Sequence, residues 1–440
     1  MELEEKFKEG LKKLNEKKIL ESLLIFQDLQ ESNPNNIDIQ FCLGNIYYEL
    51  NDLNKSLKYL KKSYEYYSNS QAVINNYAIA LQTIGKINEA ERLFNKLIQL
   101  KPNDLKAYYR LFRIGYKKFD NNYYEKIKYF EKNENLNLQD KSFINFIISK
   151  YEKKKNNIEN EVKYLNLSHQ YQFKYNQEYN YKSVNFYNNL LFNFYNKFNF
   201  TNTDQKLFKQ KKIKPIFIIG LPRSGSTLIE SLLSNDNKKL YTYGETSIFD
   251  IGIKDQLNVS NLSIKKKFEI NESSLLNRVN NIYNYKQNKN FIDKSLENFF
   301  YIDVILKLFP KAKFIHTFRN KFDAIIGIYQ SMLIYQPWTH SIDNIIKYIN
   351  NYENIISYFK NKYPDKILEI DLEKFTLSPI VYSKKIYNFC NLEWDENILK
   401  FYKKKNLTSK SSSFLQIRNG ITKYDNKKYR PYYYLFKKKI

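Results

Sequence analysis

The stretch that decides the fold reads Pro215-Ile-Phe-Ile-Ile-Gly-Leu-Pro-Arg-Ser-Gly-Ser-Thr-Leu-Ile229. Its apolar residues at 216–219 have the pattern of a fully buried strand, and the apolar spacing from Ser226 to Leu233 is helical. A tight loop from Gly220 to Gly225 connects the two. A strand, a glycine loop and a helix in this order direct backbone N–H groups and the positive end of a helix toward a phosphate. The stretch therefore predicts a phosphate-binding loop.

This loop departs from the nucleoside-triphosphate motif G-x-x-x-x-G-K-[ST] at one decisive position. Ser226 stands where that motif has its lysine, and the nearest cation is Arg223, inside the loop. The lysine of an NTPase contacts the β- and γ-phosphates, and the following hydroxyl holds magnesium. Here a guanidinium, hydroxyls and backbone donors are offered to a short anionic group, with no metal required. A nucleotide kinase or NTPase of related fold stays open as an alternative.

Beyond this loop, strand-like and helical patterns alternate along the chain. Apolar runs typical of strands lie at 216–219, 240–243, 291–292, 314–318 and 367–370, and helical patterns lie at 226–233, 296–308 and 323–333. Such alternation predicts a parallel sheet covered by helices on both faces. Ligands of these sheets bind outside the carboxyl ends of the strands. We therefore expect the chemistry at the residues that follow the strands, which are Arg223, Glu245, Lys294 and Arg319.

The first hundred residues contain a repeat of 34 positions. Gly10, Gly44 and Ala78 are spaced by 34, as are Phe26, Leu60 and Phe94. Small residues at the first set of positions and at Ser22, Ser56 and Ala90 let two helices approach closely, and prolines end the second helix of a unit. The pattern resembles the tetratricopeptide repeat. The prediction is an all-α tetratricopeptide superhelix followed by an α/β P-loop-like domain with a parallel sheet.

We divide the chain into three parts. Residues 1–135 are assigned to tetratricopeptide repeats and residues 136–210 to degenerate helical repeats with a linker. Residues 211–440 are assigned to the α/β domain. The linker is the basic, polar segment from Lys206 to Lys214, which ends where the first predicted strand begins.

The loop Pro222-Arg-Ser-Gly-Ser-Thr227 resembles the 5′-phosphosulfate loop of the sulfotransferase family. That resemblance extends over about residues 213–435 and implies 3′-phosphoadenosine 5′-phosphosulfate (PAPS) as the co-substrate, with no metal. It implies that Arg223, Ser224, Gly225, Ser226 and Thr227 hold the phosphosulfate. Phe314-Ile-His-Thr-Phe-Arg319 resembles the 3′-phosphate segment, so Arg319 takes the place of the family's arginine. The family's serine eight residues later is Gly327 here, and what replaces its hydroxyl is an open question.

Three further segments carry the implied catalytic residues. Gly244-Glu245-Thr246 resembles the Gly-Glu segment of tyrosylprotein sulfotransferases, which makes Glu245 the expected base for a hydroxyl acceptor. Asp293-Lys294 resembles the family's Asp-Lys stretch, so Lys294 is expected to stabilise the leaving oxygen. The resemblance of Ser413-Phe-Leu-Gln-Ile-Arg418 to a C-terminal family element implies that Ser413 positions the sulfate and Arg418 contacts the nucleotide. The histidines at 169, 316 and 340 are expected to be structural.

Composition restricts the function less than the motifs do. Lys and Arg total 72 against 46 for Asp and Glu, a formal charge of +26, which favours polyanionic ligands without naming one. Cys42 and Cys390 allow neither a disulfide framework nor a zinc motif. No apolar run reaches the ~18 residues of a membrane span, so we expect a cytoplasmic protein without specific nucleic-acid binding.

The function predicted from the sequence is transfer of a sulfuryl group from PAPS to a hydroxyl by in-line displacement. Protein tyrosine and glycans are the candidate acceptors, and the concave face of the repeats is the expected contact for a protein, peptide or glycan. Besides the kinase or NTPase, a second alternative is a non-catalytic repeat scaffold with a degenerate sulfotransferase domain. The sequence leaves the acceptor, the oligomeric state and the role of the repeats undecided.

Overall fold

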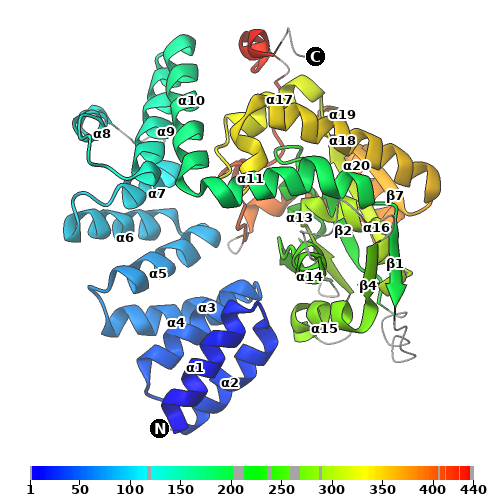
Figure 1. Cartoon of the computed structure of the whole chain (residues 1–440), viewed down its shortest axis with the longest axis horizontal. Coiled ribbons are helices and arrows are strands. Elements are labelled where there is room, and N and C mark those ends of the chain that lie inside the picture. Colours follow the sequence, from blue (N-terminus) through cyan, green and yellow to red (C-terminus); the bar gives the residue numbers. More distant parts are fainter. Residues whose placement is uncertain are drawn as a thin grey trace.

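The structure, a computed structural model, describes residues 2–115, 120–201, 213–234, 240–257, 268–286, 290–404, 407–411, 413–425 and 427–436. Figure 1 shows the N-terminal helices as a curved stack beside an α/β region. No described helix combines the length and apolar character needed to cross a bilayer. The predicted linker from Lys206 to Lys214 lies outside the described residues except at its last two positions.

The N-terminal region consists of consecutive antiparallel helices, as the 34-residue spacing predicts. They are α1 (Glu2–Asn15), α2 (Ile19–Ser32), α3 (Ile37–Glu49), α4 (Leu53–Tyr66), α5 (Gln71–Thr83), α6 (Ile87–Leu100) and α7 (Leu105–Gly115). Each pair packs on the next, with α2 against α3, α4 against α5 and α6 against α7. An all-α repeat region followed by an α/β domain is thus confirmed.

Small residues permit the close helix approach within each pair. A Cβ added at Gly10 would lie 2.7 Å from the ring of Phe26, and one at Gly44 would lie 2.8 Å from Leu60. The hydroxyl of Ser22, fully buried, donates a 2.9 Å hydrogen bond to the Gly10 carbonyl across the same interface. The 34-residue spacing of small and large residues is therefore explained by knob-and-gap packing between the two helices of a unit.

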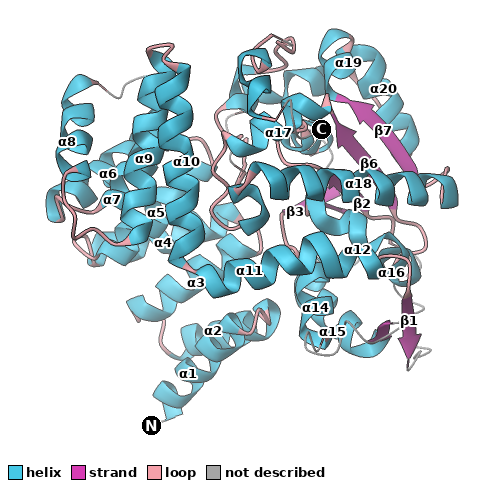
Figure 2. Cartoon of the chain, turned by 45° about the horizontal axis from the view of Figure 1, so that its top comes forward, coloured by secondary structure: helices cyan, strands magenta, loops and turns pink. Residues whose placement is uncertain are grey.

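A second helical segment connects the repeats to the α/β region. It contains α8 (Asn121–Glu131), α9 (Leu138–Lys154), α10 (Ile158–Tyr175), α11 (Gln177–Asn185), the π-helical turn η2 (Phe186–Leu190) and α12 (Leu191–Phe194). Figure 2 shows α9 and α10 side by side, with α11 running toward the α/β region. There α11 packs against η7 (Pro337–His340) and η2 packs against α18 (Ile342–Lys362). The two regions are consequently joined over a broad contact.

The α/β region contains the predicted parallel sheet. Its strands are β2 (Ile216–Gly220), β3 (Leu240–Gly244), β5 (Asn290–Asp293), β6 (Lys313–Phe318) and β7 (Ile367–Asp371), in the spatial order β3-β5-β2-β6-β7. All neighbours are parallel, for instance with Ile218 opposite Ile315. A separate parallel pair, β1 (Phe198–Thr201) with β4 (Phe268–Asn271), has no counterpart in the sequence prediction.

Helices surround the sheet. They are α13 (Ser226–Leu233), α14 (Ile248–Gln256), α15 (Glu272–Tyr283), η5 (Asn284–Lys286), η6 (Leu296–Tyr301), α16 (Ile302–Leu308), α17 (Lys321–Tyr329), α19 (Leu372–Leu377), α20 (Pro379–Cys390), η8 (Glu396–Lys403), η9 (Gln416–Asn419) and η10 (Arg430–Leu435). The helix predicted over 296–308 is two elements, because Tyr301 has non-helical dihedrals of φ −115° and ψ 18°. The helix predicted over 323–333 ends earlier, at Tyr329, and Met332 is left-handed.

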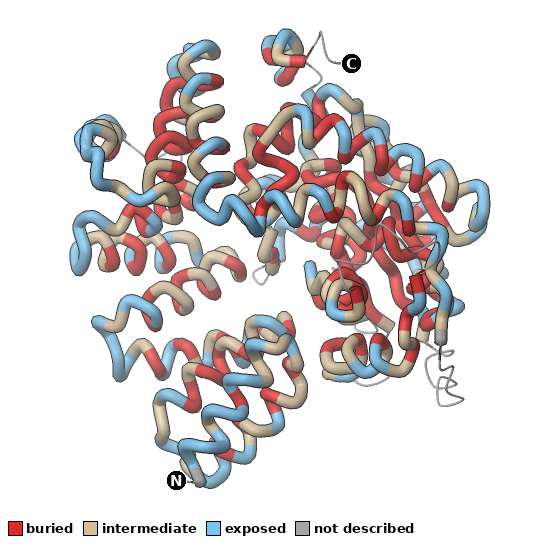
Figure 3. Tube along the Cα trace, viewed as in Figure 1, coloured by how far each residue is buried: buried red, intermediate tan, exposed pale blue. Residues whose placement is uncertain are grey.

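The two faces of the sheet belong to different apolar cores. On β2, Phe217 and Ile219 join a core that continues into the repeat helices, whereas Ile216 and Ile218 join a smaller core with α13 and α20. Figure 3 shows the buried strands at the centre of the α/β region. Because one core extends from the repeats to the sheet, the repeats are packed as part of the same molecule rather than as a tethered accessory.

Candidate functional site

The loop between β2 and α13 adopts a conformation suited to binding an anion. Gly225 is the residue before α13 and has φ +91°, and a Cβ there would lie 2.6 Å from Leu372. Arg223 also has positive φ, at +69°. At the other end, a Cβ on Gly220 would lie 2.3 Å from the Thr317 carbonyl oxygen of β6. Glycine is thus required at both ends of the loop, once for the turn and once for close strand approach.

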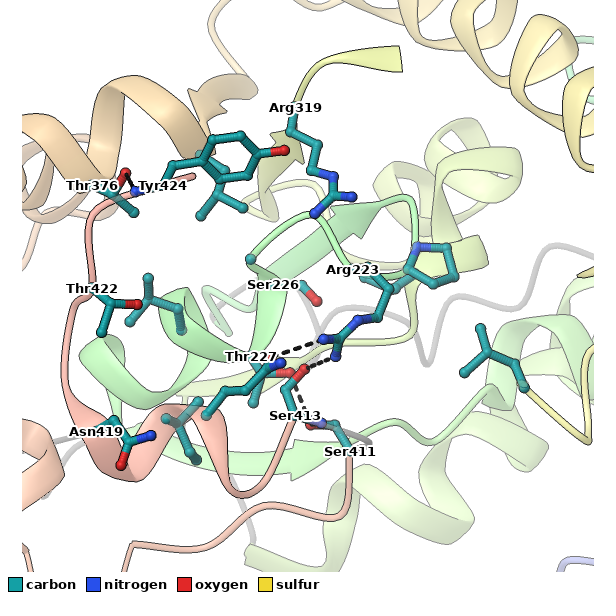
Figure 4. Close-up of a pocket in the computed structure, with 18 of the residues that line it drawn as sticks. Arg223, Ser226, Thr227, Arg319, Thr376, Ser411, Ser413, Asn419, Thr422 and Tyr424 are labelled. Atoms are coloured by element: carbon teal, nitrogen blue, oxygen red, sulfur yellow. Dashed lines mark hydrogen bonds between the residues drawn. The ribbon is translucent and has the colours of Figure 1, made fainter. Parts of the chain in front are cut away.

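Arg223 is held over the loop by residues from the C-terminal segment (Figure 4). Its Nη1 donates to the Ser413 hydroxyl at 2.6 Å, and its Nη2 donates to Gln416 Oε1 at 2.9 Å. The Thr227 hydroxyl, at the start of α13, donates to the Ser411 hydroxyl at 3.0 Å. The predicted pair Arg223 and Ser413 is therefore in direct contact, although 190 residues separate the two.

The other loop residues divide between the cavity and the interior. Ser226 and Thr227 line the cavity, as does Gly225. Ser224 is buried instead, because its hydroxyl donates to the Leu221 carbonyl at 2.6 Å and lies 2.9 Å from Thr317 Oγ1. Its side chain thus closes the turn, and any contact with a ligand is left to its backbone.

Arg319 follows β6, as predicted, and lines the same cavity. Its guanidinium lies 4.8 Å from the ring centre of Tyr429 and 5.7 Å from that of Tyr424, and it donates to the Asp323 carbonyl. Its Nε is buried without a hydrogen-bond partner among the described residues. A buried cationic donor without an acceptor fits an anionic ligand, because such a donor is costly to leave unpaired.

Gly327, in the place of the family's serine, lies directly under this arginine. A Cβ at Gly327 would lie 2.4 Å from Arg319 Nη2, so any side chain there would displace the guanidinium. Ser331, one turn further along the chain, does not replace the missing donor, because its hydroxyl donates to the Gly327 carbonyl at 2.6 Å. The Tyr429 hydroxyl faces the same cations: burial raises its pKa, but the charges of Arg319, Lys428 and Arg223 outweigh this and lower it.

Glu245 and Lys294 meet at the ends of β3 and β5. A register shift between Thr242 and Gly244 precedes Glu245, whose side chain is 47% exposed and lines the cavity. The Lys294 ammonium, 2% exposed, pairs with Glu245 and lies 3.8 Å from Glu230 of α13. Burial lowers the pKa of Lys294, but the two carboxylates outweigh it and raise the pKa. Lys294 is thus a charged partner behind Glu245 and is not among the described residues that line the cavity.

Arg418 does not join the other predicted residues. It is absent from the described lining of the cavity, and its guanidinium donates to the carbonyls of Phe414, Leu407 and Thr83. Thr83 is the last residue of α5, in the repeats. The direct nucleotide contact expected for Arg418 is therefore not what this arrangement offers, because its donors are occupied by backbone carbonyls.

The cavity has a volume of about 700 Å³ and is rich in cations. Cationic residues that the sequence interpretation did not select contribute to its lining, namely Arg113, Lys410, Lys423 and Lys428. Lys410 lies beside Ser411 in a serine-rich run next to the predicted Ser413, so its neighbourhood was a usable signal. Arg113 comes from α7 of the helical region, and nothing in its local sequence marks it.

The histidines lie apart from this chemistry. Of the described residues that line the cavity, none is a histidine. His169 and His340 face each other with their Nδ1 atoms 2.9 Å apart, and His169 Nε2 contacts the Tyr329 carbonyl at 2.8 Å. His316 contacts the Tyr352 hydroxyl and lies 3.3 Å from Glu369. All three histidines are buried, so we assign them a structural role in the packing of the interior.

Comparison with known proteins places this site in context. Residues 215–396 match the model of the sulfotransferase family. An uncharacterised protein of Aquifex aeolicus (strain VF5) is 29% identical over 238 residues, which are 50% of this chain and 31% of that protein. The chain thus spans about a third of the length of this curated relative.

Two solved structures are similar to part of the chain at low identity. The sulfotransferase domain of the Synechococcus PCC 7002 olefin synthase is 21% identical, with a TM-score of 0.36, over 50% of this chain and 86% of that one. The crystal structure of MamA is 19% identical, with a TM-score of 0.31, over 38% of this chain and 95% of its own.

Proposed function

We propose that this protein transfers a sulfuryl group from PAPS to a hydroxyl acceptor, because residues 215–396 match the model of the sulfotransferase family. The observation that carries the proposal is the convergence of Arg223, Arg319 and Glu245 on one cationic cavity of about 700 Å³. The first two face an anionic donor, and the third is a carboxylate available to a hydroxyl. The family match supports the reaction class, and the cavity supports the choice of donor.

The residues present fit such a donor. The loop from Arg223 to Thr227 offers backbone donors, hydroxyls and the N-terminus of α13 to a phosphosulfate. The buried, unpartnered Arg319 Nε offers a charge-assisted hydrogen bond to a second phosphate of the donor. Ser226 in place of a lysine suits a donor whose transferred group is a sulfuryl, with no lysine required across two phosphates.

We assign each catalytic role by position. Glu245 accepts the proton of the acceptor hydroxyl as the new S–O bond forms and the bond from sulfur to the nucleotide phosphate breaks. Lys294 keeps Glu245 oriented, because its buried ammonium pairs with that carboxylate. Ser413 and Arg223 are in contact, and together they would stabilise the charge that develops on the leaving oxygen. The products are a sulfate ester and 3′-phosphoadenosine 5′-phosphate (PAP).

The acceptor is proposed to be presented from the side of the repeats. Arg113 of α7 contributes to the lining of the same cavity as Glu245, so an acceptor held by the repeats has a short path to the base. A protein tyrosine and a glycan hydroxyl both have the required O–H group. Incubation with 35S-labelled PAPS and fractionated protein and glycan pools identifies which class gains label.

Nucleotide binding separates this proposal from its alternatives. Calorimetry with PAP is expected to show binding, while ATP with magnesium shows no turnover. Magnesium-dependent ATP hydrolysis would instead support the kinase or NTPase interpretation. Absence of both PAP binding and label transfer would favour a non-catalytic scaffold.

A further inference from the structure

A loop of the α/β region is attached to the ends of two repeat helices. The Lys410 ammonium donates to the Tyr48 carbonyl and, at 3.4 Å, to the Glu49 carbonyl at the end of α3. The Ser409 amide donates to the Thr83 carbonyl at 3.0 Å, where α5 ends. Arg418 Nη2 reaches the same Thr83 carbonyl at 3.2 Å.

These attachments use a general property of helices. The last carbonyls of a helix lack partners inside it and form the negative end of the helix dipole, so cations are stabilised there. Lys410 and Arg418 supply such cations to α3 and α5. Arg418 also donates to the Leu407 carbonyl at 2.7 Å and to the Phe414 carbonyl, which draws both sides of the loop together.

The attached loop is the one that reaches the proposed donor site. Its Ser411 hydroxyl accepts from Thr227, and its Ser413 hydroxyl accepts from Arg223. The serines of this loop also contact one another. The Ser413 amide donates to Ser411 Oγ at 3.2 Å, and Ser409 Oγ lies 2.9 Å from Ser411 Oγ. A continuous series of contacts therefore runs from the end of α5 to the phosphosulfate loop.

We propose that the helical repeats form part of the donor site, with Arg418 as a positioning residue that holds Ser411 and Ser413 toward the phosphosulfate loop through the Thr83 carbonyl at the end of α5. The proposal rests on the proposed sulfotransferase function. It gives Arg418 a role without direct contact with the nucleotide, and it makes the repeats necessary to the chemistry as well as to any acceptor.

Gly85 in the repeats provides an independent way to disturb this attachment. It has φ +86°, and a Cβ there would lie 2.4 Å from Arg418 Nε. An alanine would therefore push the guanidinium off the α5 carbonyl from the repeat side, with no change in the α/β region. Lys86, the next residue, serves as a matched control because its ion pair is with Glu89 in its own helical turn.

Calorimetric titration of the full chain with PAPS, without acceptor, tests the proposal. Arg418→Gln and Gly85→Ala are each expected to weaken PAPS binding about fivefold, the loss of roughly one hydrogen bond. Lys86→Ala should bind like the wild type. Arg418→Lys should recover part of the loss, because a lysine keeps the charge at the end of α5.

A double-mutant cycle with Ser413→Ala distinguishes positioning from general stabilisation. If Arg418 acts through Ser413, the double variant should bind PAPS no more weakly than the weaker single variant. Multiplied losses, or wild-type affinity in both Arg418→Gln and Gly85→Ala, would overturn the proposal. Failure of the wild type itself to bind PAPS would overturn the proposed function instead.

Discussion

At the residue scale, the proposed chemistry centres on a carboxylate, Glu245, with a buried cationic partner. Glu245 lines the cavity and Lys294 supports it from the interior. No histidine is available among the described lining residues. We therefore propose Glu245 as the base that removes the acceptor proton.

Replacement of Glu245 by glutamine should separate catalysis from binding. We expect turnover to fall by about 10²- to 10⁴-fold, the usual contribution of a general base, while PAP affinity stays close to the wild-type value. Steady-state rates with labelled PAPS and calorimetry with PAP measure the two quantities. Glu269→Gln, an exposed carboxylate on β4, is the control. Normal turnover in Glu245→Gln would rule out the assigned base.

Lys410 is expected to give donor binding a pH dependence. Burial lowers the pKa of this lysine to about 8, and it lines the cavity. Below that pH the ammonium is charged and attracts the donor; above it the charge and the attraction are lost. PAP affinity, measured by calorimetry from pH 7 to 9.5, should fall as the pH rises through about 8. The Lys410→Met variant should bind PAP more weakly at pH 7, and its PAP affinity should not fall as the pH rises through about 8. The same pH profile in the variant and the wild type would contradict this role of Lys410.

At the element scale, α17 is shaped by the arginine that precedes it. Gly327 leaves the space that the Arg319 guanidinium occupies, and Asp323 of the same helix accepts hydrogen bonds from the hydroxyls of Tyr424 and Tyr433 at 2.5 and 2.6 Å. The helix thus binds the C-terminal segment on one side and Arg319 on the other. Gly327 is therefore needed to leave room for the Arg319 side chain.

Restoration of the family's serine at 327 is therefore expected to harm the protein. Gly327→Ser should weaken PAP binding about tenfold, in line with the usual cost of overpacking, because the Cβ displaces Arg319. Gly115→Ala is the control, since the nearest atom to its added Cβ lies 4.0 Å away. Tighter PAP binding by Gly327→Ser, again by calorimetry, would show that the missing hydroxyl had been the limiting feature.

At the scale of the whole molecule, two buried histidines join the helical region to the α/β region. His169 lies on α10 and His340 on η7, and Lys150 of α9 adds a further positive charge nearby. Burial lowers the pKa of His169 well below its usual value and that of His340 to about 4. In the unfolded chain both titrate near 6.5. Below that pH the unfolded chain therefore binds more protons than the folded one, and stability is lost as the pH falls.

The junction should accordingly weaken in acid. Below pH 6.5 each neutral histidine costs about 1.4 kcal/mol of unfolding free energy per pH unit, and for His340 this continues down to about pH 4. The unfolding temperature, followed by calorimetry, should be lower at pH 5 than at pH 7.5. His340→Gln removes one of the two groups and should reduce the difference. An equal difference in the variant would show that other groups determine the acid sensitivity.

The loop that carries Ser411 and Ser413, here called the donor loop, joins the two regions of the molecule. Arg418, Lys410 and Ser409 join the α/β region to the carboxyl ends of α3 and α5. The apolar core continues across the same boundary. The repeats and the α/β region are therefore expected to unfold together, and deletion of residues 2–115 should expose apolar surface and loosen the donor loop.

Much of this molecule could be predicted from the sequence because its determinants are local. Residues 216–233 specify strand, turn and helix by their own apolar spacing and glycines, and the predicted strand runs coincide with β2, β3, β5, β6 and β7 to within a residue or two. The 34-residue repeat likewise follows from contacts between small and large residues within each unit, so their spacing in the sequence predicts it. Arg223, Arg319 and Glu245 were found because parallel strands end at the same edge of a sheet.

Only the tertiary structure decided what distant residues do to one another. The Arg418 guanidinium donates to the Thr83 carbonyl at the end of α5, and Arg113 of α7 lines the cavity. Gly327 leaves the space that the Arg319 guanidinium occupies. Each depends on how two surfaces far apart in the chain pack together, and side-chain type or spacing carries no record of that. Strands, turns and helices follow from residues that are consecutive in the chain. Which groups accept hydrogen bonds from an arginine side chain is determined only by the fold of the whole chain.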